Sequence, residues 1–143
     1  MPADVKKISR RIFEEVWNNK NIDLVNELMV DDYMHHDPQS PVADGIDSYK
    51  QMVLYYLKAF PDLRFTLGDE LSEGELVVTR WTATGTHEGD LAGLPRSGKQ
   101  FSVTGMTMAR ITNGRVVESW SNWDTLGMMQ QLGGSLDATG RAA

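Results

Sequence analysis

The sequence predicts an α+β fold in which N-terminal helices pack on a curved, mainly antiparallel β-sheet that encloses a pocket. Helical periodicity dominates residues 3–60, and segments that alternate apolar and polar residues follow from residue 63 to residue 123. Two long runs rich in Val, Ile, Thr, Met and Trp flank Asn113-Gly114. That dipeptide is typical of a tight hairpin because both residues tolerate positive φ. Helices followed by such a meander form a cone that is open at one end.

Apolar residues recur at spacings of three and four in three N-terminal segments. The spacing predicts an amphipathic helix from about Ala3 to Asn18 and a short second helix from about Ile22 to Met29. A third helix is expected to begin after Asp44, whose carboxylate can cap it, and to end at Pro61.

A polar segment from Asp31 to Pro38 separates the second and third helices and predicts a short strand that ends before the proline. The sheet continues with a strand around Leu63 to Leu67, a turn at Ser72-Glu73-Gly74, and the strands Leu76 to Thr86, Gln100 to Ile111 and Arg115 to Trp123. A last helix begins near Asp124 and stops at Gly133-Gly134. We expect one domain over residues 1–143, with residues 135–143 as a frayed tail.

Composition excludes several classes of protein. The 143 residues carry a net charge of −6, which argues against a nucleic-acid partner because such a partner needs a basic face. There is no cysteine, so disulfides, thiolate metal sites and thiol nucleophiles are excluded. No apolar run reaches membrane-spanning length, and the N-terminus lacks the apolar core of a signal peptide. We therefore expect a cytoplasmic protein with no membrane or nucleic-acid partner.

Four short motifs span nearly the whole chain. They are Val16-Trp17-Asn18, Asp32-Tyr33-Met34-His35-His36, the stretch from Gly85-Thr86-His87-Glu88-Gly89 to Gly93-Leu94-Pro95-Arg96-Ser97-Gly98-Lys99, and Arg110-Ile111 through Asn113-Gly114 to Gln131-Leu132-Gly133. Together they resemble the SnoaL-like polyketide cyclases of the nuclear-transport-factor-2-like (NTF2-like) superfamily. The resemblance implies an α+β cone with a deep apolar pocket, commonly dimeric. It also implies cofactor-free closure of a polyketide ring by an aldol step.

In the family, an aspartate late in the last strand is the general acid/base, and this chain departs from that pattern. When Asn113-Gly114 is aligned with the family's turn, the catalytic aspartate falls on Ser121. Two polar partners on the neighbouring strand fall on Gly105 and Thr107, and an asparagine that contacts substrate falls on His35. The cyclase constellation is therefore not present as such.

His35 is the first catalytic candidate. It titrates near neutrality and can accept and return a proton without a metal, and the resemblance places it inside the cone. The alternative is a histidine that fixes the strand to the helix layer. Because successive strand residues point to opposite faces, His36 is expected to face away from the pocket.

Asp124 and Ser121 are the other catalytic candidates. A carboxylate sheltered by Trp120 and Trp123 would have a raised pKa, which suits acid/base work. An aspartate directly before Thr125 and an apolar helix is also a normal N-cap, and the local chemistry favours the cap.

His87 ends a strand before the irregular segment from Glu88 to Lys99, and a structural role there is favoured over a place on the pocket rim. His35, Asp37 and His87 could together bind a divalent ion. Their spacing matches no known ligand pattern, so no metal and no cofactor is expected.

The predicted function is that of a cofactor-independent small-molecule enzyme, of cyclase, isomerase, lyase or hydrolase type, which acts on an apolar carbonyl compound in the cone. The alternative is a non-catalytic module for small-molecule binding or dimerisation. A homodimer through the sheet is expected because the hairpin strands are too apolar to leave exposed. The candidate substrate-binding residues are Trp17, Tyr33, Trp81, His87, Thr107, Trp120 and Asn122.

Overall fold

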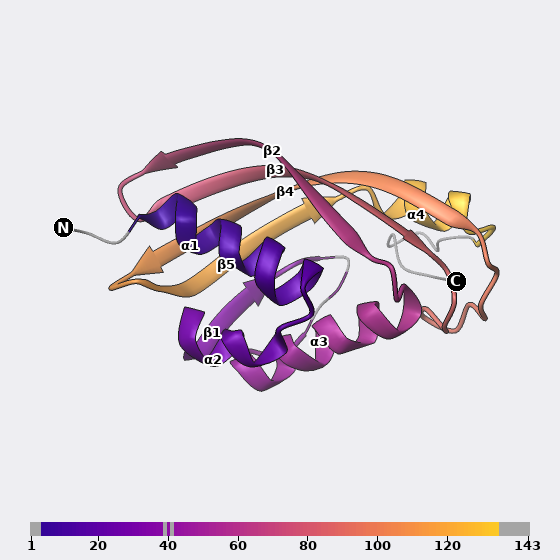
Figure 1. Ribbon diagram of the computed structural model, residues 1–143, viewed down its shortest axis with the longest axis horizontal. Helices are drawn as coiled ribbons and strands as arrows, with labels where there is room; N and C mark the ends of the chain where they lie inside the picture. The colour runs from indigo at the N-terminus through magenta and orange to yellow at the C-terminus, as the bar shows by residue number, and fades with distance from the viewer. Residues whose placement is uncertain (1–3, 39, 41, 135–143) are drawn as a thin grey trace.

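The computed structural model describes residues 4–38, 40 and 42–134, so the predicted tail at residues 135–143 lies outside the described residues. The elements along the chain are α1 (Val5–Arg11), η1 (Ile12–Asn18), η2 (Ile22–Leu24), α2 (Val25–Leu28), β1 (Met29–His36), α3 (Ile46–Ala59), β2 (Arg64–Glu73), β3 (Leu76–Thr86), β4 (Gln100–Thr112), β5 (Arg115–Trp123) and α4 (Thr125–Gln131). Figure 1 shows this arrangement.

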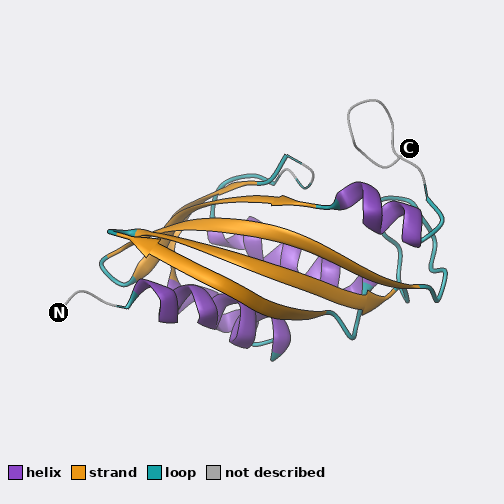
Figure 2. Cartoon of the chain, turned by 90° about the horizontal axis from the view of Figure 1, so that it is seen from above, coloured by secondary structure: helices purple, strands orange, loops and turns teal. Residues whose placement is uncertain are grey.

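A single five-stranded sheet organises the molecule. Its strand order is β1-β5-β4-β3-β2, with β1 parallel to β5 and every other neighbouring pair antiparallel. The long strands curve together, and α1, η1 and α3 lie on the concave side of the sheet (Figures 1 and 2). The predicted α+β fold with N-terminal helices on a mainly antiparallel sheet is confirmed.

The β4–β5 hairpin forms as predicted at Asn113-Gly114. Both residues have positive φ, 52° for Asn113 and 79° for Gly114, which is the backbone that a tight hairpin turn requires. The preceding turn is displaced by about one residue from the prediction, because β2 continues through Glu73 and the chain reverses at Gly74 and Glu75. The hairpin's register places Thr107 opposite Ser121.

The first helix extends from Val5 to Asn18, within two residues of the predicted bounds, but its second half is a π-helix. The wider turn presents two pairs of neighbouring side chains to the interior: Ile12 with Phe13, and Val16 with Trp17. Asn18 anchors the end of the helix because its side chain exchanges two hydrogen bonds with the Phe65 backbone, at 2.9 and 2.8 Å. The π-helix is thereby fixed against β2 and forms one wall of the interior.

Two details of the other helices correct the prediction. The second helix is split into η2 and α2, and Met29 already belongs to β1. Asp44 does not cap α3; the N-cap is Gly45, which has φ 105° and makes no side-chain cap. Its backbone N donates to the Tyr33 carbonyl at 2.7 Å, so the backbone of β1 fixes the start of α3. Glycine suits this position because other residues avoid that φ.

In the portion of the chain that the structure covers, none of the helices is both long enough and apolar enough to cross a lipid bilayer.

The outer face of the sheet carries exposed apolar side chains. Met106 on β4 is 54% exposed and Met34 on β1 is 39% exposed, and the strand between them, β5, carries the half-buried Trp120. We expect two copies of the chain to associate through this face. Sedimentation at micromolar concentration should give twice the chain mass, and Met106→Lys should lower it towards one chain. A clean single-chain species for the unmodified protein would contradict the expectation.

Candidate functional site

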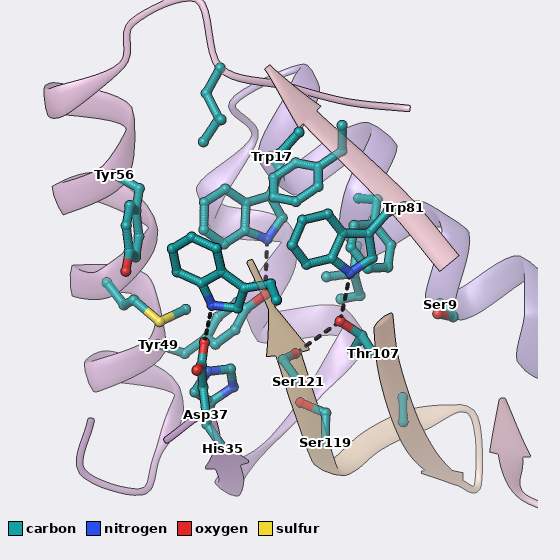
Figure 3. Close-up of a pocket in the computed structure, with 18 of the residues that line it drawn as sticks. Ser9, Trp17, His35, Asp37, Tyr49, Tyr56, Trp81, Thr107, Ser119 and Ser121 are labelled. Atoms are coloured by element: carbon teal, nitrogen blue, oxygen red, sulfur yellow. Dashed lines mark hydrogen bonds between the residues drawn. The ribbon is translucent and has the colours of Figure 1, made fainter. Parts of the chain in front are cut away.

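A deep pocket lies between the concave face of the sheet and the helices α1, η1 and α3 (Figure 3). Its empty volume is about 900 Å³, including space open to solvent. Aromatic rings form one wall, where Phe65 packs edge-on against Trp17 and Trp81 with ring centroids 5.2 and 5.1 Å apart. A cavity of this character suits a flat apolar ligand with a few oriented polar groups.

His35 lines this pocket from β1, and its side chain is half-buried. Its Nδ1 lies 2.9 Å from the Tyr33 hydroxyl. That hydroxyl also hydrogen-bonds Ser119 Oγ on the neighbouring strand. Nε2 of His35 is enclosed, and no hydrogen-bond partner for it exists among the described residues. One ring nitrogen is therefore held in place while the other is unpaired.

Burial lowers the pKa of His35 below its ordinary value of 6.5. The carboxylate of Asp37 acts in the opposite direction and raises the pKa, whereas His36 lowers it further. The net direction is downward, so the neutral imidazole prevails at pH 7. A neutral imidazole with an unpaired nitrogen has the form that a general base requires.

The next residue, His36, points to the opposite face of the sheet. Its Nε2 pairs with Glu118 Oε2 at 2.6 Å, and its ring stacks on Trp120 with centroids 5.4 Å apart. Arg110 lies over the same indole, 5.9 Å from its centroid. His35 and His36 thus occupy different environments, one inside the pocket and one on the outer face.

Asp37 is a pocket residue that the sequence suggested only as a metal ligand. It is 8% exposed, lines the pocket beside His35, and accepts a hydrogen bond of 2.8 Å from Trp123 Nε1 (Figure 3). Its position two residues after His35 is the signal that could have found it, since alternate residues of an extended segment share a face.

A second polar group lies on the inner wall, where Trp81 Nε1 donates to Thr107 Oγ1 at 3.0 Å and Thr107 hydrogen-bonds Ser121 at 2.9 Å. Gly105 makes room for the Trp81 indole, because a Cβ there would lie 2.6 Å from the ring carbon Cη2 and 2.7 Å from Trp123 Cβ. Trp81 therefore requires a glycine at position 105.

Four of the predicted site residues lie outside the pocket lining. Trp120 and Asn122 are on the outer face of β5, because Ser119, Ser121 and Trp123 alternate inward. Asp124 is exposed and caps α4, where its Oδ1 accepts from the Gly127 backbone at 2.8 Å. The structure thus gives Asp124 the capping role that local chemistry favoured.

His87 is fully buried away from the pocket, where its Nδ1 lies 2.9 Å from Ser97 Oγ and its ring packs on Phe60. These contacts fit the structural role that was favoured for it. The lining residues that the sequence proposed and the structure places there are His35, Ser121, Trp17, Tyr33, Trp81 and Thr107.

Two tyrosines of α3, the buried Tyr49 and the half-buried Tyr56, also line the pocket and were not foreseen as site residues. Burial raises the pKa of both Tyr49 and Tyr56 to about 12, so each remains a neutral phenol. Tyr49 accepts a hydrogen bond of 3.0 Å from Trp17 Nε1, and Tyr56 pairs with Ser40. Their spacing predicted a buried helix face, and only the fold turns that face into a pocket wall.

Over residues 4–38, 40 and 42–134, no group of three or more His, Asp or Glu side chains is arranged to hold a metal ion. His35 and Asp37 lie together, but His87 is apart from them.

Comparison with known proteins gives consistent matches. Residues 7–132 match the model of the protein family described as SnoaL-like polyketide cyclase. The aklanonic acid methyl ester cyclase DnrD of Streptomyces peucetius is 27% identical over 136 residues, which cover 93% of this chain and 92% of that protein. DauD, the cyclase of the same description from Streptomyces sp. (strain C5), is 27% identical over 123 residues, which cover 83% of this chain and 76% of that protein.

Solved structures agree with the sequence matches. A protein from Acidithiobacillus ferrooxidans superposes with a TM-score of 0.81 at 32% identity, covering 92% of this chain and 97% of that one. TsrD from Streptomyces laurentii gives a TM-score of 0.81 at 28% identity, and the match covers 90% of this chain and 94% of TsrD.

Proposed function

The chain belongs to the SnoaL-like polyketide cyclase family, and from this premise we propose that it is a cofactor-independent enzyme that uses His35 to move protons on an apolar carbonyl compound. The observation that carries the proposal is the unpaired, enclosed Nε2 of a pocket histidine whose Nδ1 is already held by Tyr33. The resemblance implies that Ser121 stands where the family has its catalytic aspartate, and a serine cannot supply that carboxylate, so we assign the base to His35.

The chain of hydrogen bonds from Ser119 through Tyr33 to His35 decides which nitrogen of His35 carries the proton. Burial raises the pKa of Tyr33 well above 10, so its hydroxyl keeps one proton to donate. If Tyr33 donates to Ser119, its oxygen accepts the Nδ1 proton of His35 and leaves Nε2 as a free base. Either tautomer leaves Nε2 without a partner among the described residues, and we choose this one because a buried N–H without an acceptor is rarer in proteins than an unpaired acceptor.

The same three groups can also return a proton. When Nε2 takes a proton from a substrate carbon, the imidazolium keeps its Nδ1–H bonded to the Tyr33 oxygen. In an aldol ring closure, the enolate carbon then attacks a ketone carbon, a carbon–carbon bond forms, and the new alkoxide takes the proton from Nε2. The proton balance closes without a cofactor, and His35 ends in its starting form.

The pocket supports a substrate that is flat, apolar and oxygenated. Its walls are largely aromatic and aliphatic, and its polar groups are few and held in fixed positions. Two relatives are named as cyclases of aklanonic acid methyl ester. We therefore propose a polyketide of this general class as the substrate, bound as a neutral molecule.

The proposal is tested by deuterium exchange on a simple enolisable ketone, 2-acetylnaphthalene. In D₂O, the protein should exchange the methyl protons faster than free imidazole at the same concentration, as followed by NMR. Exchange no faster than that of free imidazole would indicate a binding module without base catalysis, the alternative that the sequence left open.

We expect the exchange rate to be flat around pH 7 and to fall as the pH drops through the lowered pKa of His35. The sign follows from the chemistry, since only the neutral imidazole can take a proton and burial shifts its protonation to lower pH. His36→Ala should keep the shape of the profile, because that side chain lies on the outer face, and its only effect should be a slightly higher midpoint, because His36 lowers the pKa of His35. A midpoint above 6.5 would contradict His35 as the titrating base.

A further inference from the structure

Beyond His35, the inner wall carries a chain of three polar groups that the proposed proton transfers do not use. Trp81 Nε1 lies 3.0 Å from Thr107 Oγ1, and Thr107 Oγ1 lies 2.9 Å from Ser121 Oγ. Thr107 and Ser121 face each other across β4 and β5, and both line the pocket. Ser121 is only 9% exposed.

Counting the protons shows that one O–H of this hydrogen-bonded group has no acceptor within the group. The indole N–H can only donate, so Thr107 accepts that bond. The two hydroxyls carry one proton each, and the single bond between them consumes one of the two. Among the described residues, neither hydroxyl has a further acceptor for the other proton. Whichever way the Thr107–Ser121 bond points, one O–H therefore remains unpaired in the pocket wall.

We propose that Thr107 and Ser121 form a subsite that donates one hydrogen bond to an acceptor oxygen of the ligand, namely the oxygen of a ketone or of the enolate derived from it. The subsite carries no positive charge, so it suits a neutral carbonyl better than a carboxylate. Binding of the ketone does not depend on the proposed function, whereas stabilisation of the enolate rests on it, because the enolate forms only if His35 removes the α-proton.

The subsite is correctly placed relative to the base. Ser119 is the Cα partner of His35, and Ser121 is two residues further along the same face of β5. Two strand residues span about 6.6 Å. A ketone whose α-carbon contacts Nε2 and whose oxygen accepts from the hydroxyl pair would span this interval along the pocket wall. The donor then lies where negative charge develops when the α-proton leaves.

The test uses 2-acetylnaphthalene labelled with ¹³C at its carbonyl, and the infrared stretching band of the bound ketone. A hydrogen bond lowers this frequency, so the wild-type complex should absorb below the value for the ketone in hexane. Each single variant, Thr107→Val or Ser121→Ala, leaves one hydroxyl proton in the pair. The double variant removes both hydroxyls but also leaves the Trp81 Nε1–H without its acceptor, so Trp81→Phe is added to it. The band of this triple variant should return to the hexane value. The control is Ser102→Ala/Thr104→Val, which removes two hydroxyls from the exposed face of β4 and should keep the lowered frequency.

A second measurement needs no variant. In 2-isopropenylnaphthalene the carbonyl oxygen is replaced by a CH₂ group of similar shape. The wild-type protein should bind the ketone about 3- to 10-fold more tightly than this alkene. Equal affinities, an unshifted carbonyl band in the wild-type complex, or a lowered band in the triple variant would each overturn the subsite.

The subsite and the proposed function can fail separately. His35→Gln should abolish deuterium exchange but keep the lowered carbonyl frequency. A lowered frequency without any exchange in the wild type would support the subsite and refute the base. Exchange with an unshifted carbonyl band would support the base and refute the subsite.

Discussion

Replacing His35 with alanine is expected to slow α-proton exchange by about 10²- to 10⁴-fold, the usual effect of losing a general base. The variant removes the only pocket histidine in the described part of the chain. It should still fold, because the half-buried ring is not part of the apolar core. The measurement is the exchange rate of 2-acetylnaphthalene at saturating ketone, together with the binding constant for the same ketone.

His36→Ala is the matched control. It removes a histidine from the adjacent position, together with the pairing to Glu118 and the stacking on Trp120, but all of these lie on the outer face. Its exchange rate should stay within about twofold of the wild type, since surface changes away from the site have small effects. If His36→Ala abolished exchange and His35→Ala did not, the inward face of β1 would be the one that carries His36.

Gly105→Ala is expected to destabilise the protein by about 1–3 kcal/mol, the range for forcing extra atoms into a packed interior. The new methyl group would lie 2.6 Å from Trp81 Cη2 and 2.7 Å from Trp123 Cβ, so an indole must move. Displacing Trp81 also breaks its bond to Thr107. Urea denaturation should therefore show a lower midpoint.

Thr104→Ala is the control for this substitution because Thr104 is the exposed neighbour on the outer face of the same strand. Its free energy of unfolding should change by less than about 0.5 kcal/mol. If the only effect of Gly105→Ala were to reduce the conformational freedom of the unfolded chain, the variant would be more stable than the wild type. A stabilised Gly105→Ala variant would therefore show that the Trp81 indole can move aside without lowering the free energy of unfolding.

The fold was predictable because its signals are local. The Asn113-Gly114 turn, the alternation along the strands and the three-and-four spacing in the helices each act within a few residues of sequence. Helix starts were less predictable, since Gly45 is positioned by a bond to the backbone of Tyr33 that lies twelve residues earlier. Capping rules for side chains do not include such contacts.

The site was only partly predictable, because its decisive contacts join distant residues. The hydrogen bonds Tyr33–Ser119 and Trp123–Asp37 each connect positions 86 residues apart. No periodic pattern of residues in the sequence indicates such a pairing. Trp120 is different: once Ser121 is assigned to the inner wall, side-chain alternation alone places Trp120 on the outer face. The place of Trp120 on the outer face therefore follows from the sequence, and its prediction as a pocket residue conflicts with that alternation.

At neutral pH, Nε2 of His35 should be unprotonated and without a hydrogen-bond partner among the described residues. Nitrogen-15 NMR of the ring-labelled protein measures this directly and needs no substrate. We predict that at pH 7 the proton of His35 is on Nδ1, that Nε2 has the shift of an unprotonated nitrogen, and that the ring titrates below 6.5. A proton on Nε2 at pH 7, or a ring that titrates above pH 6.5, would show that His35 is not the base that acts through Nε2.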